Sequence, residues 1–196
     1  DINSVTTTSI NNTSTGVIKA DATSGGRAYG INMTSTASVG TLINAGLISG
    51  SAASTFGRGI HLTSSNIETL TNSGRILGVA GASNGTGLLA TKSTITTLTN
   101  TGMITGSVTG AGLKEAGIRN NGGVITTFNN QQTGLTYSGT LPDNYTTIID
   151  DSGYGQLFVS NEAQAASGAT NYSPYAGSVG IGVKIKTNTY NNVITG

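Results

Sequence analysis

The side chains that could perform acid–base or nucleophilic chemistry are few in this chain of 196 residues. It contains one histidine, His61, and no cysteine. His61 therefore has no second histidine or thiolate to share a metal ion with, and thiol nucleophiles and disulfides are excluded. The segment Arg-Gly-Ile-His-Leu around it predicts a strand that turns His61 outward, and no Gly-x-Ser-x-Gly motif accompanies the serines. We expect a protein that is not an enzyme and that needs no cofactor or metal.

The carboxylates leave two chemical alternatives open. Asp150 and Asp151 are adjacent, so a strand would send them to opposite faces, whereas paired acid–base catalysis needs a shared space. We expect a turn there. A calcium site formed by Asp143, Asp150 and Asp151 is the sharper hypothesis, although the spacing of calcium-binding loops is absent. A carbohydrate-active enzyme is the other alternative, and it would need an acidic cluster that the sequence does not predict.

The cationic residues indicate neither a nucleic-acid partner nor a membrane partner. The formal net charge is +1, and no run of Lys and Arg could release counterions from a phosphate backbone. Six cations are spread along the chain with only Glu68 and Glu115 among them: Arg27, Arg58, Arg75, Lys92, Lys114 and Arg119. Lys114 and Glu115 lie in the longest insertion between repeats, where a loop could contact a partner.

An internal repeat with a period of about 28 to 30 residues dominates the sequence. Residues 39–50, 67–78 and 95–106 read VGTLINAGLISG, IETLTNSGRILG and ITTLTNTGMITG; a weaker copy covers 9–20, and a further one begins at Ile125. Short β-type segments separated by Gly, Asn and Ser turns at this period pair with the same segment of the next unit rather than as hairpins. The repeat predicts an all-β solenoid of parallel coils.

Stacked coils place equivalent residues above one another. Asn44, Asn72, Asn100 and Asn130 are expected to form a ladder of amide hydrogen bonds at a turn. Gly46, Gly74 and Gly102 follow two residues later, where we expect a positive φ or a close approach of two backbones. The apolar columns of the expected core are Val39, Ile67, Ile95 and Ile125; Leu42, Leu70, Leu98 and Phe128; and Ile48, Ile76 and Ile104.

Threonines form a column on the expected outer face. Thr41, Thr69, Thr97 and Thr127 recur at equivalent positions, with Thr96 and Thr126 beside them on two coils. Flat threonine arrays on solenoids can bind ice, but Gly40 and Glu68 interrupt the second file. Threonine is also simply a good strand former on an exposed face.

The repeat weakens toward the C-terminus. We expect one domain over residues 1–196, with regular repeats in 1–134 and irregular coils or a cap in 135–196. Pro142, Lys184 and Lys186 are candidates for blunting an open strand edge. Six of the seven tyrosines lie in this part, and only Tyr29 and Phe56 precede Phe128 among the aromatic residues. A sugar-stacking surface is therefore expected in the C-terminal third.

The units INAGLISG, TNSGRILG and TNTGMITG, followed by YSGTLPDNYTTIIDDSGYGQLFVS, resemble the passenger domains of autotransporters, the type V secreted proteins of bacteria. The resemblance implies a right-handed parallel β-helix that is exported and displayed or released outside the cell. The absence of cysteine fits a route in which an unfolded chain threads a pore. These residues include no translocator barrel, and the first residue, Asp1, suggests a processed or excised piece.

These observations favour a non-catalytic structural or adhesive rod of a secreted or surface-displayed bacterial protein, attached to the outer membrane through a segment not included here. The alternatives are a solenoid that binds a glycan, a receptor or ice, and a subunit of a self-assembling extracellular filament. We expect a cell-surface or extracellular ligand, with end-to-end or lateral homo-oligomers as a further partner. No stretch approaches the roughly 18 apolar residues of a membrane helix.

Overall fold

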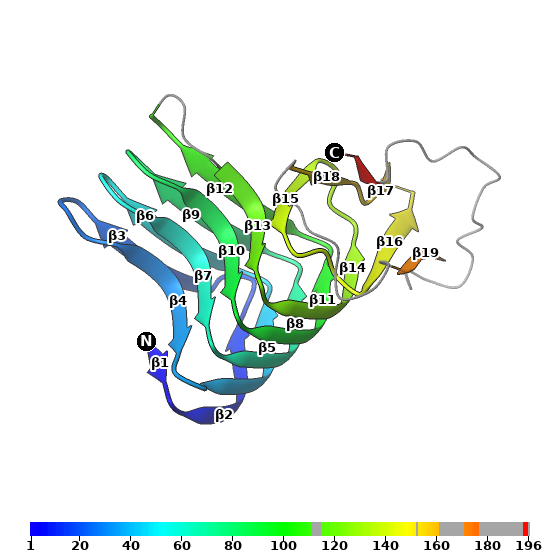
Figure 1. Ribbon diagram of the computed structural model, residues 1–196, viewed down its shortest axis with the longest axis horizontal. Helices are drawn as coiled ribbons and strands as arrows, with labels where there is room; N and C mark the ends of the chain where they lie inside the picture. The colour runs from blue at the N-terminus through cyan, green and yellow to red at the C-terminus, as the bar shows by residue number, and fades with distance from the viewer. Residues whose placement is uncertain (111–114, 152, 161–170, 177–193, 196) are drawn as a thin grey trace.

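The computed structural model describes residues 1–110, 115–151, 153–160, 171–176 and 194–195. The described residues form β-strands and no helix, and the strands stack as parallel coils (Figure 1). The expected β-solenoid is therefore confirmed. Strands arise because Thr, Val and Ile suit a pleated surface, while Gly, Asn and Ser separate the segments.

The strands belong to three sheets, which we call A, B and C. Sheet A contains β1 (Ile2–Asn3), β4 (Ala28–Thr34), β7 (Gly57–Thr63), β10 (Gly85–Thr91), β13 (Glu115–Asn121), β15 (Leu135–Gly139), β18 (Leu157–Val159) and β20 (Ile194–Thr195). Sheet B contains β2 (Thr6–Asn12), β5 (Ser38–Asn44), β8 (Asn66–Asn72), β11 (Thr94–Asn100), β14 (Val124–Asn130), β16 (Asn144–Asp150), β17 (Gly153–Tyr154) and β19 (Asn171–Ala176). Sheet C contains β3 (Val17–Ala22), β6 (Leu47–Ala52), β9 (Arg75–Ala80) and β12 (Met103–Val108).

Each complete coil passes through sheet B, then sheet C, then sheet A. Four such coils run from β2 to β13. The coils pair in register, so that Ile48 lies opposite Ile76 and Ile76 opposite Ile104. These three side chains are fully buried, as are Leu42, Leu70 and Leu98 of sheet B and Ile60, Leu88 and Ile118 of sheet A. The core is one continuous set of apolar stacks along the solenoid.

Sheet A bends at the glycine row Gly30, Gly59 and Gly87. The ladder pairs Tyr29 with Arg58 and Ile31 with Ile60, but it passes over the glycine between them. A Cβ on Gly59 would lie 2.6 Å from Ile76 Cγ2, so this position faces inward, as does the buried Ile60 that follows it. Two consecutive inward positions interrupt the alternation of side chains along the strand. The strands β4, β7 and β10 curve along their length, so that the outer face of sheet A is concave (Figure 1).

Sheets A and C meet through glycines on the far side of that bend. Cβ atoms on Gly50 and Gly78 would overlap backbone carbonyl oxygens of sheet A, including that of Thr86. Sheets separated by side chains pack about 10 Å apart, so these glycines allow a much closer approach. The turns that join β3 to β4, β6 to β7 and β9 to β10 project together at the upper left of Figure 1.

Gly46, Gly74 and Gly102 fulfil one of their two expected roles. None is among the glycines with a positive φ. Instead, a Cβ on Gly74 would overlap the carbonyl oxygen of Gly46 in the preceding coil, and one on Gly102 would overlap that of Gly74. Close stacking of consecutive turns therefore requires glycine here.

The regular coil ends where sheet C ends, at β12. In the following coil, β14 continues to β15 without a sheet C strand, and the Gln132 side chain occupies the open edge. Its Oε1 accepts from the Ile104 backbone N–H at 2.7 Å, and its Nε2 donates to the Ile104 carbonyl oxygen at 3.1 Å. One amide side chain thus replaces a peptide unit of the absent strand. Pro142 is buried before β16, and Lys184 and Lys186 lie outside the described residues.

Candidate functional site

The asparagine ladder lies inside the solenoid. Asn44, Asn72, Asn100 and Asn130 are fully buried. The Nδ2 of each donates to the Oδ1 of the next, at 2.7, 2.8 and 3.1 Å along the series. Asn12 extends the ladder by one coil, at 2.7 Å from Asn44; its unit is a weak copy, so the sequence did not reveal it. Because each described amide is satisfied, this network stabilises the stack and leaves no group free for a ligand.

The threonine column lies on the outer face of sheet B. Its four members pair in register through four coils: Thr41, Thr69, Thr97 and Thr127. The row two residues further along the strands contains Ile43, Thr71, Thr99 and Asn129. Only two of these coils carry threonine in both rows. The face offers ordered hydroxyl groups, but it lacks the uniform double row that would match a crystal surface.

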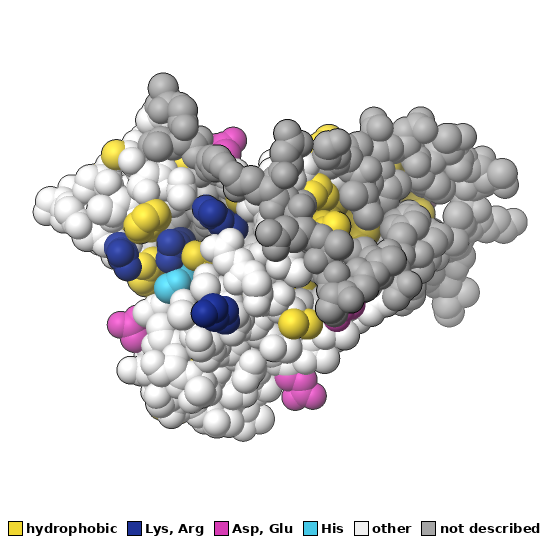
Figure 2. Space-filling model, in the orientation of Figure 1, with side chains coloured by type: hydrophobic (Ala, Val, Ile, Leu, Met, Phe, Trp, Pro, Cys, Tyr) yellow, Lys and Arg dark blue, Asp and Glu magenta, His cyan; other side chains and the backbone are white. Residues whose placement is uncertain are grey.

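Charged and aromatic side chains gather instead on the outer face of sheet A (Figure 2). Tyr29 of β4 lies opposite Arg58 of β7, and His61 follows Arg58 on the same strand. Arg27 precedes β4, and Phe56 precedes β7. We call these five residues the arginine–aromatic cluster. They meet because β4 and β7, which belong to adjacent coils, pair in register in sheet A.

The cluster is a series of stacked planar groups. The Arg58 guanidinium carbon lies 5.4 Å from the Tyr29 ring centre and 4.8 Å from that of Phe56. Arg27 lies 5.3 Å from the Phe56 ring centre. The rings of Tyr29 and His61 stack at 4.6 Å with an angle of 30° between their planes. Cation–π contacts of this kind contribute about 0.5–2 kcal/mol each, so the rings hold the Arg58 guanidinium in place.

His61 is neutral, and both of its ring nitrogens are hydrogen-bonded. Its Nδ1 lies 2.7 Å from Asn32 Oδ1, and its Nε2 lies 3.0 Å from Thr63 Oγ1. A neutral ring satisfies both contacts when Nδ1–H donates to Asn32 and the Thr63 hydroxyl donates to Nε2. Burial, followed by repulsion from Arg58 and Arg27, lowers the His61 pKa to about 4. With both nitrogens bonded, His61 offers no free base at neutral pH.

Arg58 is the least well satisfied polar group of this face. Burial lowers its pKa, and the positive charges of Arg27 and Arg119 lower it further, while Tyr29 acts in the opposite direction. Its Nε is buried without a hydrogen-bond partner. A buried donor left unpaired costs about 1–3 kcal/mol. Within the part of the chain that the structure describes, the only ion pair joins Lys19 and Asp21 at 2.8 Å, on sheet C.

The structure corrects the expectation that the cations are spread along the coils. Arg27, Arg58 and Arg119 lie close enough for their charges to interact, although 92 residues separate the first from the last. The register explains this, because Arg119 pairs with Leu89 and Leu89 with His61. Aligning the repeats on Gly30, Gly59, Gly87 and Gly117 would have placed Arg27, Arg58 and Arg119 in three neighbouring rows of sheet A.

The tyrosines of the C-terminal part correct a second expectation. Tyr137 and Tyr145 are buried in the core rather than displayed for a ligand, and burial raises the pKa of Tyr137. Tyr145 packs against Phe128 with ring centres 5.5 Å apart. Large side chains fill this part of the core because β14 is not followed by a sheet C strand. Of the others, Tyr154 is half-buried, and the side chains of Tyr172, Tyr175 and Tyr190 lie outside the description.

The aspartates form a turn. Asp150 Oδ1 accepts from the Gly153 N–H at 3.2 Å, between β16 and the antiparallel β17. Among the described residues, no three His, Asp or Glu side chains gather into a group that could hold a metal ion. Lys114 lies outside the described residues, and its expected partner Glu115 is exposed at the start of β13.

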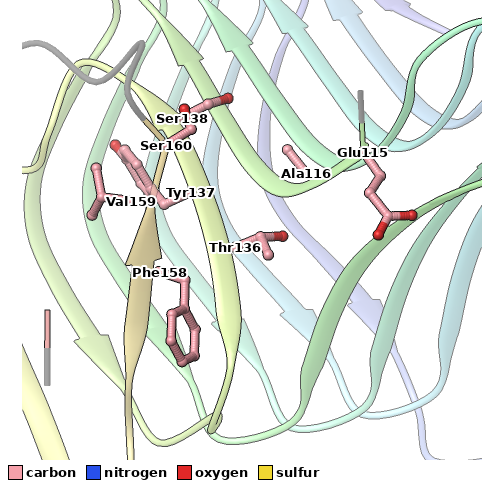
Figure 3. A pocket seen from close by; sticks show the side chains of 8 residues that line it. All are labelled: Glu115, Ala116, Thr136, Tyr137, Ser138, Phe158, Val159 and Ser160. Atoms are coloured by element: carbon pink, nitrogen blue, oxygen red, sulfur yellow. The ribbon is translucent and has the colours of Figure 1, made fainter. Parts of the chain in front are cut away.

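A pocket of about 250 Å³ lies on sheet A beyond the cluster. It is lined by side chains of β13, β15 and the β18 region, and Figure 3 shows Tyr137 and Val159 on one side of it and Glu115 on the other. Phe158 contributes a 42% exposed ring. Ala116, at its wall, belongs to the same row as Arg58, two strands further along.

Comparison with known proteins identifies no relative. No protein-family model matches the chain, and no curated protein or solved structure does. In the residues that the structure describes, no helix is long and apolar enough to cross a membrane. Function must therefore be inferred from the geometry of the fold and of the face of sheet A.

Proposed function

We propose that the chain is a non-catalytic rod of a secreted or surface-displayed bacterial protein, comparable to an autotransporter passenger, with a structural or adhesive role. The observation that carries this proposal is the unbroken stacking of four coils. The apolar columns and the asparagine ladder pass through all of them in register. Such a molecule suits the presentation of surfaces at a distance from the cell.

The physical basis of this role is nearest-neighbour stacking. Each coil contacts only the coils beside it, so stability is the sum of similar interfaces, and a rod resists local opening where its neighbours are intact. Backbone pairing between coils satisfies the N–H and C=O groups, and glycines such as Gly74 let consecutive turns stack closely. The resulting rod is stiff without needing disulfides.

Two features support export and a non-catalytic role. The chain has no cysteine, so it can cross an oxidising compartment and a pore unfolded without forming disulfides. His61, its one histidine, has both ring nitrogens engaged in hydrogen bonds. The resemblance of the repeat units to passenger domains points to the same compartment.

The shape of the 196-residue chain in solution tests the rod. Light scattering with negative-stain imaging over a concentration series should give discrete monomeric rods that resist proteolysis over the four coils. Compact or aggregated particles, or rapid cleavage within residues 1–130, would contradict the proposal. Filaments growing end to end would show that the open strand edges adhere, and would replace it with self-assembly.

Export is tested separately by fusing the chain to an autotransporter translocator. The rod should appear on the outer membrane of intact cells, where added antibody reaches it. A matched fusion in which Ser49 and Leu77, paired neighbours of the chain on sheet C, are both replaced by cysteine should form a disulfide in the periplasm and stall. Retention of the unmodified chain inside the cell would contradict the export proposal.

A further inference from the structure

The outer face of sheet A carries positive charge that no described residue neutralises. After burial, the positive charges of Arg27 and Arg119 lower the pKa of Arg58, and those of Arg58 and Arg27 lower the pKa of His61. Among the described residues, no carboxylate lies within ion-pair distance of any of them, and the one ion pair joins Lys19 and Asp21. Like charges held together by rings and backbone, without an anion, form a site that an external anion would complete.

The geometry of Arg58 favours anions that present two oxygens side by side. The rings of Tyr29 and Phe56 flank its guanidinium, which fixes the plane of the fork. A fixed guanidinium binds carboxylate or sulfate through two parallel hydrogen bonds, whereas a flexible ammonium does not.

The surroundings favour a polysaccharide over other polyanions. Next to the arginines stand the neutral side chains Asn32 and Thr63, both bonded to His61, rather than further cations. Asn32 also donates to Asp1 Oδ1 at 2.8 Å, at the edge of this face. A phosphate backbone carries a charge on every unit and is bound by denser Lys and Arg clusters. An acidic polysaccharide alternates charged groups with neutral hydroxyls, as this face does. The row that holds Arg58 also reaches Ala116 at the wall of the pocket, so the face is extended along the rod.

We propose that the concave outer face of sheet A binds an acidic polysaccharide, whose carboxylate or sulfate group is held by Arg58 with Arg27 and Arg119 beside it. This inference goes beyond the proposed rod function and does not depend on it, because binding can be measured whether or not the chain is displayed on a cell.

The test measures binding of the full 196-residue chain to four probes: polygalacturonate, dextran sulfate, neutral dextran and single-stranded DNA. Polygalacturonate and dextran sulfate distinguish carboxylate from sulfate as the bound group. One or both should bind, with an affinity that falls as salt rises, and neutral dextran should not. Tighter binding of DNA, equal binding of neutral dextran, or no binding of any probe would overturn the proposal.

Variants locate the site. Arg58→Gln should weaken binding of the acidic polysaccharide by at least about ten-fold, the effect of losing a charge-assisted hydrogen bond, and Arg58→Lys should restore only part of it. Arg119→Gln changes a second arginine of the same face on another coil. A loss of binding in this variant therefore cannot come from misfolding of the Arg58 variant. The matched control is Arg75→Gln, an exposed arginine on sheet C, which should change affinity less than about two-fold if binding needs this face. Equal losses at Arg58 and Arg75 would reduce the effect to net charge and overturn the assignment.

Discussion

The asparagine ladder is fully buried and the arginine–aromatic cluster is partly buried, and the two differ in how completely their polar groups are paired. In the ladder, Asn72 donates to Asn100 and accepts from Asn44. In the cluster, Arg58 has a buried Nε without a partner and other cations close by. Completed pairing holds a fold together, whereas incomplete pairing costs stability. The difference separates a structural network from a face suited to bind something.

The largest effect is expected from breaking the ladder in its middle. Asn72→Ala removes the acceptor of Asn44 Nδ2 and the donor to Asn100 Oδ1 in the core. This leaves Asn100 Oδ1 unpaired and leaves Asn44 Nδ2 with only the Arg75 carbonyl oxygen. The free energy of unfolding should fall by about 3 kcal/mol, measured by urea denaturation. Asn66→Ala, at the exposed start of the same strand, should cost about 0.5 kcal/mol or less. Similar losses from both variants would show that the ladder adds no special stability.

A smaller effect is expected at the end of the ladder. Gln132→Ala removes the side chain that bonds the Ile104 N–H and carbonyl and also accepts from Asn100 Nδ2 at 3.1 Å. Stability should fall by about 1–2 kcal/mol, and hydrogen exchange at the Ile104 amide should accelerate. Gln132→Glu keeps the acceptor but loses the donor, so it should be intermediate. Unchanged exchange at Ile104 would contradict the capping role.

The repeat period explains how much of the fold the sequence predicts. Residues such as Ile76 and Asn72 have equivalents in every regular coil, so their stacking follows once the coils are recognised. Whether each equivalent position is apolar or polar indicates which face of the coil it occupies. Gln132 was not predicted, because a single side chain that replaces a strand leaves no periodic signal. The close contact of sheets A and C was also missed, since a glycine such as Gly78 does not reveal which backbone approaches it.

The candidate site was missed for a different reason. Arg58 and Tyr29 do not repeat, so they stand out as neither column nor motif, and Arg119 is far away in sequence. Their proximity depends on the exact register of sheet A and on the bend at Gly59, where two inward positions bring two outward rows together. The buried tyrosines were missed for a similar reason. Tyr145 fills core space that exists only where sheet C has ended, and the sequence does not show where that is.

The pH dependence of stability probes the cluster from within. The unfolded chain holds His61 at its ordinary pKa of 6.5, whereas the folded chain holds it at about 4, so the unfolded state binds more protons between these values. Stability should therefore be constant above pH 7 and fall as the pH drops below 6.5. Because the ring is only partly buried, we expect a loss of about 0.5–1 kcal/mol between pH 7.5 and 5.5.

His61 is the one histidine, so the assignment of this slope can be checked by a single change. His61→Gln removes the titrating ring, and its denaturation midpoints at pH 7.5 and 5.5 should agree. A slope that persists in the variant would have to come from other groups and would contradict the depressed pKa of His61.

The smallest change in stability is expected at Arg58, and its sign separates the two regions most sharply. Arg58→Met replaces the desolvated charge by an apolar chain of similar length, which removes the unpaired Nε and the repulsion from Arg27 while it keeps contact with the rings of Tyr29 and Phe56. Replacing a poorly paired buried charge by an apolar side chain is often neutral or stabilising, so the free energy of unfolding should stay constant or rise by up to about 1 kcal/mol. Binding of the acidic polysaccharide should be lost in the same variant, whereas Arg75→Met should leave binding intact. A clear loss of stability in Arg58→Met would mean that the guanidinium holds the coils together as the asparagines do, and the distinction between a structural network and a binding face would fail.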